Sequence, residues 1–251
     1  CGKLMNEKVF ITGASSGIGA ALAIEYAKRG ATLGISARRS EKLEVIAQQC
    51  KESGAANVFS YPLDVTNQDN SADTAKEFIT TASGIDIVIA NAGVAYSDKI
   101  SSGEATRINK VFSTNVLGVT NSIIPFVPTM KENLSGKIVI ISSIASFRPI
   151  AFHGGYAASK SAVRMLADSW RMALRKYKIQ ITAICPGFIV SEMTDENKFP
   201  MPFLLETEDA ARKMIKAIDN GKKTYILPWQ IKMILYATRW LPTSLYYKIF
   251  F

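Results

Sequence analysis

The sequence predicts a doubly wound α/β fold, in which helices cover both faces of a parallel β-sheet. Short apolar runs alternate with helical stretches along almost the whole chain, which is typical of that architecture. A glycine-rich segment follows the first apolar run, and much later a tyrosine and a lysine stand four residues apart on a predicted helix. A chain of 251 residues suffices for one well-buried domain and is short for two, so we assign residues 5–228 to a single domain.

Strands and helices follow one another in strict alternation. Runs that are apolar throughout are typical of parallel strands buried on both faces, and they predict strands at 9–11, 32–35, 85–90, 137–141, 179–184 and 223–227. Between them we expect helices at 18–29, 41–53, 69–82, 105–131, 155–177 and 208–220, joined by right-handed crossovers. Pro125 and Pro128 are expected to kink or end the fourth helix, because proline removes a backbone donor.

The first loop has the composition of a phosphate-binding turn. Between the first strand and the first helix it reads Thr12-Gly13-Ala14-Ser15-Ser16-Gly17-Ile18-Gly19. Glycines allow a tight turn and let bare backbone approach a phosphate, and a helix N-terminus adds free N–H groups and partial positive charge. This position favours a nucleotide site over a flexible turn without a ligand.

The end of the second strand indicates which cofactor is bound. An acid there would hold the adenosine ribose hydroxyls and favour NAD, but no acid occurs before Glu41. A guanidinium instead matches a phosphate bidentately. We therefore expect Arg38, with Arg39 and Ser15 nearby, to bind the 2′-phosphate of NADP. The alternative is that both arginines belong to a solvated turn.

Tyr156 and Lys160 form the candidate catalytic pair. Positions i and i+4 share a helix face, so the two side chains point the same way. A free phenol has a pKa of ~10, and a neighbouring ammonium is expected to lower it. Tyr156 could then give a proton to an alkoxide as hydride reaches a carbonyl carbon, or take one in reverse. The alternative is a solvated amphipathic pair.

Together these motifs resemble the short-chain dehydrogenase/reductase family in its single-domain form, over residues 8–191. The spacing Gly-x-x-x-Gly-x-Gly is that of the family. The resemblance implies a Rossmann fold with seven parallel strands, one of which ends at Leu63-Asp64-Val65. It also implies that Asp64 contacts the adenine and that Asn91-Ala92-Gly93 supports the sheet and lies against the ribose.

The resemblance assigns further roles around Tyr156. Ser143, thirteen residues before Tyr156, should polarise the substrate carbonyl. Asn115 should order a water in a proton relay to Lys160, which should also hold the nicotinamide ribose. The backbone of Ile189 should hold the carboxamide. Other expected cofactor contacts are Pro186, Gly187 and Ser191, whereas His153 is expected in the pocket wall and Cys185 in the core. Family members pair through the helices at 105–131 and 155–177, so we expect a homodimer or homotetramer.

Two segments bear on substrate and partners. Residues 191–206 correspond to the variable substrate loop of the family, and their apolar stretch 199–205 favours a hydrophobic substrate or, equally, a loop packed on its own core. Residues 229–251 form an aromatic and basic extension, in which Lys232 and Arg239 share a helical face. This composition is typical of an interfacial helix, and the alternative is a tail that covers the cleft or a second subunit. Its aromatic residues are Trp229, Tyr236, Trp240, Tyr246, Tyr247, Phe250 and Phe251.

Composition excludes several classes. The formal charge is +9, but five of these positive charges follow Asp219 and no nucleic-acid-binding signature accompanies them. Three unpaired cysteines argue against disulfides and for a reducing compartment, and no metal site is expected. Residues 1–4 are expected to be foreign to a chain that begins at Met5, rather than a lipoprotein terminus. We see no apolar run of the ~18 residues that a membrane span needs, and expect a cytoplasmic protein with optional membrane contact through the tail.

The sequence therefore predicts an NADPH-dependent reductase of a ketone or aldehyde on an apolar small molecule. Tyr156 would supply the proton and the nicotinamide the hydride. The alternatives are an NADP-dependent alcohol dehydrogenase that runs oxidatively, or an NADP(H)-binding sensor or scaffold without catalysis. The presence of Asn115, Ser143 and Lys160 beside Tyr156 argues against a sensor, which needs no proton relay.

Overall fold

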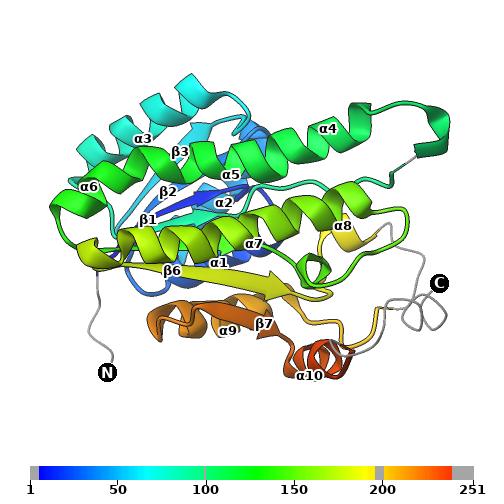
Figure 1. Ribbon diagram of the computed structural model, residues 1–251. Helices are drawn as coiled ribbons and strands as arrows, with labels where there is room; N and C mark the ends of the chain where they lie inside the picture. The colour runs from blue at the N-terminus through cyan, green and yellow to red at the C-terminus, as the bar shows by residue number, and fades with distance from the viewer. Residues whose placement is uncertain (1–5, 99, 196–200, 239–251) are drawn as a thin grey trace.

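The computed structural model describes residues 6–98, 100–195 and 201–238, and within them seven strands form one parallel sheet (Figure 1). The spatial order is β3-β2-β1-β4-β5-β6-β7, which confirms the predicted doubly wound fold. The expected strand positions are met within a few residues. The strands are β1 (Lys8–Thr12), β2 (Thr32–Ala37), β3 (Asn57–Pro62), β4 (Ile87–Ala90), β5 (Gly136–Ile141), β6 (Ile179–Pro186) and β7 (Thr224–Leu227).

Helices cover both faces of this sheet. One face carries α1 (Gly17–Ala27), α2 (Ser40–Glu52) and α9 (Thr207–Asp219), and α1 contacts both of the others. The other carries α3 (Gln68–Ala82), the helical run at 106–132 and α7 (Gly154–Leu174), as Figure 1 shows. Two further helices follow strands β6 and β7 in the chain, namely α8 (Glu192–Asp195) after β6 and α10 (Trp229–Thr238) after β7.

Strand residues alternate between two hydrophobic cores. Val9 and Ile11 belong to the core under α1, α2 and α9, while Phe10 between them belongs to the core under α3 and α7. The Phe10 ring centroid lies 5.3 Å from that of Phe78 and 5.0 Å from that of Phe126, which ties two helices to the central strand. Burial on both faces explains why these strands are apolar throughout.

The helical run at 106–132 departs from a regular α-helix. It consists of α4 (Thr106–Phe112), a π-helical segment (Ser113–Leu117), α5 (Gly118–Ile123), a 3₁₀ turn (Ile124–Phe126) and α6 (Val127–Glu132). Pro125 lies in the 3₁₀ turn, and the run continues past both prolines rather than ending there. Contrary to expectation, the run is long and apolar enough by composition to cross a membrane. However, 44 % of its most apolar window is buried in the protein, and the core helix of a globular fold can meet the same criteria of length and composition.

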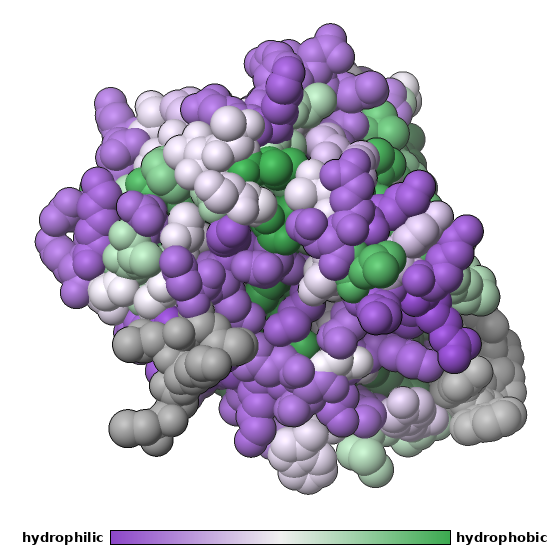
Figure 2. All heavy atoms as spheres, turned by 90° about the vertical axis from the view of Figure 1, so that its left-hand side faces the viewer, coloured by the Kyte–Doolittle hydropathy of each residue, from purple (hydrophilic) through white to green (hydrophobic). Residues whose placement is uncertain are grey.

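The sheet order places the functional loops together. Strand order reverses between β1 and β4, so the loops that follow these two strands diverge and leave a crevice at the carboxyl ends of the strands. The opposite face of the molecule, at the amino ends of the strands, is covered mostly by hydrophilic side chains (Figure 2). The nucleotide loop and the Tyr156 pair both belong to the carboxyl-end side.

Candidate active site

Two loops at the switch point are hydrogen-bonded to each other. The Asn91 side chain donates to the carbonyls of Thr12 and Gly13, at 3.0 Å each. In return, the Thr12 hydroxyl accepts hydrogen bonds from the backbone N–H groups of Asn91 and Ala92, at 3.2 Å each. The segment after β4 therefore holds the glycine loop after β1 in a fixed shape.

Neighbouring backbone atoms lie so close to the first loop that glycine is required there. Gly13 has φ +69°, and a Cβ there would lie 2.7 Å from the Cα of Ala92. A Cβ on Gly19 would lie 2.4 Å from the Gly13 carbonyl oxygen. Gly17 also has positive φ and opens α1. This turn presents backbone and a helix N-terminus to the crevice, which fits a pyrophosphate group.

Arg39 reaches the glycine loop. Its guanidinium donates to the Ser15 hydroxyl at 3.1 Å and to the Ser16 hydroxyl at 2.8 Å. It also donates to the carboxylate of Glu192 at 2.7 Å. Lys42 approaches the same carboxylate at 2.5 Å. A basic cradle with two hydroxyls thus forms beside the phosphate loop.

Arg38 lies apart from this cradle. Its guanidinium is 4.0 Å from the carboxylate of Asp64, which itself accepts hydrogen bonds from the backbone and hydroxyl of Thr66. Partial burial alone would raise the pKa of Asp64, but the Thr66 hydrogen bonds and the charges of Arg38 and Lys110 lower it below its ordinary value. Arg38 therefore pairs with Asp64, and Arg39 is the arginine that contacts Ser15.

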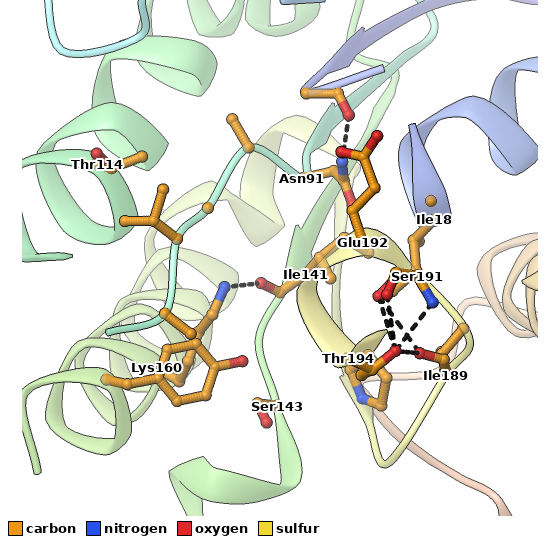
Figure 3. Close-up of a pocket in the computed structure, with 18 of the residues that line it drawn as sticks. Ile18, Asn91, Thr114, Ile141, Ser143, Lys160, Ile189, Ser191, Glu192 and Thr194 are labelled. Carbon is orange, nitrogen blue, oxygen red and sulfur yellow. Dashed lines mark hydrogen bonds between the residues drawn. The ribbon is translucent and has the colours of Figure 1, made fainter. Parts of the chain in front are cut away.

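Tyr156 and Lys160 extend from α7 into the same cleft. The Lys160 ammonium lies 5.8 Å from the centroid of the Tyr156 ring and donates to the Ile141 carbonyl at 2.9 Å (Figure 3). The Ser142 hydroxyl donates to the Lys160 carbonyl at 2.8 Å, which ties the helix to the end of β5. The shared face predicted from their spacing is present.

The protein environment sets the protonation of this pair. Burial lowers the pKa of Lys160 to about 8, so its ammonium form dominates at neutral pH. Burial raises the pKa of Tyr156 above its ordinary value, and a hydrogen bond with Ser143 offsets this only in part. The expectation of a lowered phenol pKa was therefore wrong for the protein by itself, because desolvation of the phenolate outweighs the hydrogen bond with Ser143. Tyr156 is held as a protonated phenol.

Ser143 and Asn115 differ in their access to the cleft. Ser143 lies in the cleft wall before a 3₁₀ turn (Ile144–Ser146), and its hydroxyl accepts from the Ala145 N–H at 3.1 Å. Asn115 is fully buried in the π-helical segment and lies behind the wall. Its amide oxygen accepts from the Val94 N–H at 2.8 Å, and its amide nitrogen donates to the Val94 carbonyl and to Ser159 on α7. Asn115 thus joins the loop after β4 to the helix that carries Tyr156.

The segment after β6 forms the third side of the cleft. The Thr194 hydroxyl donates to the Ile189 carbonyl at 2.8 Å and accepts from the Ser191 N–H at 2.9 Å, as Figure 3 shows. A Cβ on Gly187 would meet Ile231 of α10 at 2.7 Å, so the backbone packs tightly there. Thr194 was not recognised in the sequence, although it lies only three residues after Ser191.

These residues enclose one cleft of about 870 Å³, a volume suited to a dinucleotide and part of a substrate. Of the site residues predicted from the sequence, all but Gly19 and Asn115 line it, and these two support it from behind. His153 lies in the wall, as expected, with Nδ1 3.3 Å from the Ala151 carbonyl. The sequence did not indicate several other lining residues, among them Val94, Thr114, Ile150, Phe152, Phe188 and Glu192.

Part of the expected substrate loop and tail lies outside the described residues. In the described part of the loop, Phe203 and Leu204 are about half exposed, and neither is among the residues that line the cleft. Residues 199 and 200, residues 1–4, and the tail from Arg239 to Phe251 are not described.

Known proteins confirm the family. Residues 7–200 match the family described as short chain dehydrogenase. An uncharacterized oxidoreductase of Myxococcus xanthus is 36 % identical over 94 % of this chain and 93 % of its own. An 11-beta-hydroxysteroid dehydrogenase-like protein of Arabidopsis thaliana is 33 % identical over 90 % of this chain and 75 % of its own. Among solved structures, the alcohol dehydrogenase of Thermococcus sibiricus complexed with 5-hydroxy-NADP superposes with a TM-score of 0.78, at 26 % identity, over 88 % of this chain and 95 % of that one.

The chain therefore belongs to the short-chain dehydrogenase/reductase family. It is a nicotinamide-dependent oxidoreductase that acts on alcohol or carbonyl groups, which confirms the predicted enzyme class. The glycine turn, the basic cradle and the cleft volume all fit such a dinucleotide.

Proposed function

We propose that this enzyme is an NADPH-dependent reductase of a ketone or aldehyde on an apolar small molecule. The observation that carries the proposal is the protonated Tyr156 phenol beside the Lys160 ammonium, in the same cleft as the Arg39 cradle. Reduction of a carbonyl needs a proton donor at the oxygen, whereas oxidation of an alcohol needs a base there. A phenol whose pKa is raised by burial is suited to the first task.

Each residue of the pair would act at a defined place. The nicotinamide, when bound, supplies the hydride. The Ser143 and Tyr156 hydroxyls would hold the substrate carbonyl oxygen, and Tyr156 would pass its proton to that oxygen as negative charge develops. Lys160 would stabilise the phenolate left behind, because its pKa of about 8 keeps it charged at neutral pH. Asn115 would hold α7 against the loop after β4 so that this alignment persists.

The preference for NADP(H) is supported by charge at the end of β2. No acid is present there to hold ribose hydroxyls, and the Arg39 guanidinium reaches Ser15 and Ser16 beside the phosphate loop. Arg38 would add positive charge from the adenine side, where Asp64 lies 4.0 Å away. A 2′-phosphate would be bound between these groups.

An apolar substrate is supported by the cleft wall rather than by residues 199–205. Ile144, Ile150 and Phe152, which lie between Ser143 and Tyr156 in the sequence, line the cleft together with Phe188, and the side chain of Phe152 is largely exposed. An apolar wall beside two hydroxyls suits a hydrophobic molecule with one carbonyl. The name of the Arabidopsis relative, a hydroxysteroid dehydrogenase-like protein, is consistent with a substrate of that type.

The test is NADPH oxidation, followed by the loss of its absorbance, against a panel of acyl, steroid, sugar and quinone carbonyls. The proposal expects turnover with apolar carbonyls, faster with NADPH than with NADH. The corresponding alcohols with NADP⁺ at the same pH form the second arm. Faster oxidation in that arm would favour the dehydrogenase alternative, and NADPH binding without turnover on any substrate would favour the sensor.

A further inference from the structure

The cradle beside the phosphate loop binds an anion that belongs to the protein itself. Both oxygens of the Glu192 carboxylate have a cationic partner, because Arg39 donates to Oε2 at 2.7 Å and Lys42 donates to Oε1 at 2.5 Å. The Ser16 hydroxyl adds a third donor to Oε2 at 3.2 Å. Two cations and a hydroxyl converging on paired oxygens are the donor set that also binds a phosphate.

Glu192 comes to this cradle from a distant part of the chain. It begins α8, directly after the segment that lines the opposite side of the cleft, and lies 153 and 150 residues from Arg39 and Lys42. Figure 3 shows its side chain between Asn91 and Ser191, on the wall opposite Lys160. A substitution at Glu192 therefore acts on the phosphate cradle without touching the proton donor.

We propose that Glu192 is a specificity-determining residue for the cofactor, whose carboxylate competes with the ribose 2′-phosphate for Arg39, Lys42 and the Ser16 hydroxyl. This inference rests on the proposed use of NADP(H). Because NAD(H) has no 2′-phosphate, it does not need these donors, so the competition lowers the affinity for NADP(H) selectively. Glu192 thereby moderates a preference that the arginines create.

The competing group stays charged under working conditions. Hydrogen bonds from Lys42 and Arg39 lower the pKa of Glu192 to about 2, so the carboxylate remains ionised at every pH at which a folded enzyme would be assayed. Both ion pairs are about half exposed to solvent, so each is weak and exchangeable rather than a fixed part of the fold. Such contacts can give way to a doubly charged phosphate.

The experiment compares two probes that differ only in that phosphate, 2′,5′-ADP and 5′-AMP. Their dissociation constants are measured by calorimetry for the full-length wild type and for Glu192→Gln, which keeps the side-chain size and removes the charge. We expect Glu192→Gln to bind 2′,5′-ADP about three- to tenfold more tightly, the size expected for releasing one or two half-exposed ion pairs. The affinity for 5′-AMP should change by less than about twofold, and the gain should shrink at high salt.

Glu132→Gln is the matched control. Glu132 ends α6, shortly before β5 begins, so it lies at the amino end of the sheet. The substitution therefore removes the same charge far from the cleft. It should leave the ratio of the two dissociation constants at the wild-type value. Lys42→Met provides a second variant, which should weaken 2′,5′-ADP binding and reduce the benefit of Glu192→Gln when the two are combined.

Three outcomes overturn the inference in distinguishable ways. An unchanged ratio in Glu192→Gln, with a wild type that prefers 2′,5′-ADP, removes the role of Glu192 and leaves the NADP(H) preference standing. Weaker binding of both probes in Glu192→Gln would mean that Glu192 holds α8 over bound nucleotide instead of competing with it. A wild type that binds the two probes equally would remove the NADP(H) preference and the competition together.

Discussion

The buried ammonium of Lys160 should cost the enzyme stability that a methionine in its place would recover. Burial lowers the pKa of Lys160 from 10.5 to about 8, whereas in the unfolded chain the amine keeps its ordinary value. At about 1.4 kcal/mol per unit of pKa, this difference corresponds to about 3 kcal/mol. Because Lys160 is almost fully buried, solvent screening does not reduce this figure substantially.

The sign of the pH dependence of stability follows from which state, folded or unfolded, loses the Lys160 proton at the lower pH. Between pH 8 and pH 10.5 the folded protein has released the Lys160 proton while the unfolded chain still binds it, so stability rises with pH in this window. The free energy of unfolding of the wild type, measured relative to that of Lys160→Met, should therefore rise by about 2–3 kcal/mol between pH 7 and pH 10. At neutral pH the variant should be the more stable protein but should have lost turnover.

Urea unfolding followed by circular dichroism at pH 7, 8, 9 and 10 measures this difference. Comparing the two proteins at each pH cancels the titration of all other groups. Lys213→Met, which removes an exposed lysine of α9, is the control, and its difference from the wild type should stay constant. A constant difference for Lys160→Met as well would refute the argument that burial destabilises this ammonium.

Four further predictions concern the site and its surroundings. Tyr156→Phe should lower turnover by ~10²–10⁴-fold while the NADPH dissociation constant changes little, and retention of a tenth of the activity would contradict its role as proton donor. Gly13→Ala should lower the melting temperature and nucleotide affinity more than Gly103→Ala, because both have φ near +70° but only the first would meet Ala92. Light scattering should show a dimer or larger assembly, because the helical run at 106–132 and α7 expose large apolar side chains, namely Leu117, Ile124, Met165 and Met172. Replacing both methionines by lysine should dissociate this assembly. Truncation after Pro228 should weaken co-sedimentation with anionic liposomes at low salt and spare the fold. A raised Michaelis constant with unchanged liposome binding would instead indicate a tail that covers the cleft.

Much of the site could be predicted because its determinants are local. A phosphate loop needs glycines at fixed spacing between a strand and a helix, and a proton donor with its lysine needs one helical turn. Gly13, Gly17, Tyr156 and Lys160 meet those requirements within a few residues of sequence. Strands buried on both faces are apolar throughout, which makes the sheet equally visible in the sequence.

Other features depended on packing between distant segments. That Arg39, rather than Arg38, contacts Ser15 depends on the direction in which each side chain leaves the end of β2. Glu192 reaches Arg39 and Lys42 across more than a hundred residues of chain, and no local pattern indicates such a contact. The direction of the pKa shift of Tyr156 was misjudged because spacing reveals a neighbouring charge but not burial, and burial raises this pKa.

The sequence by itself thus determined the fold and predicted the phosphate loop and the catalytic pair, because their residues are set by periodicity and by backbone geometry over short stretches. Only the tertiary structure decided which arginine contacts the glycine loop, which carboxylate pairs with that arginine, and in which direction burial shifts the pKa of Tyr156. Those properties depend on burial and on distances between side chains from separate elements. Such distances exist only once β1, β2, β6 and α7 have come together around one cleft.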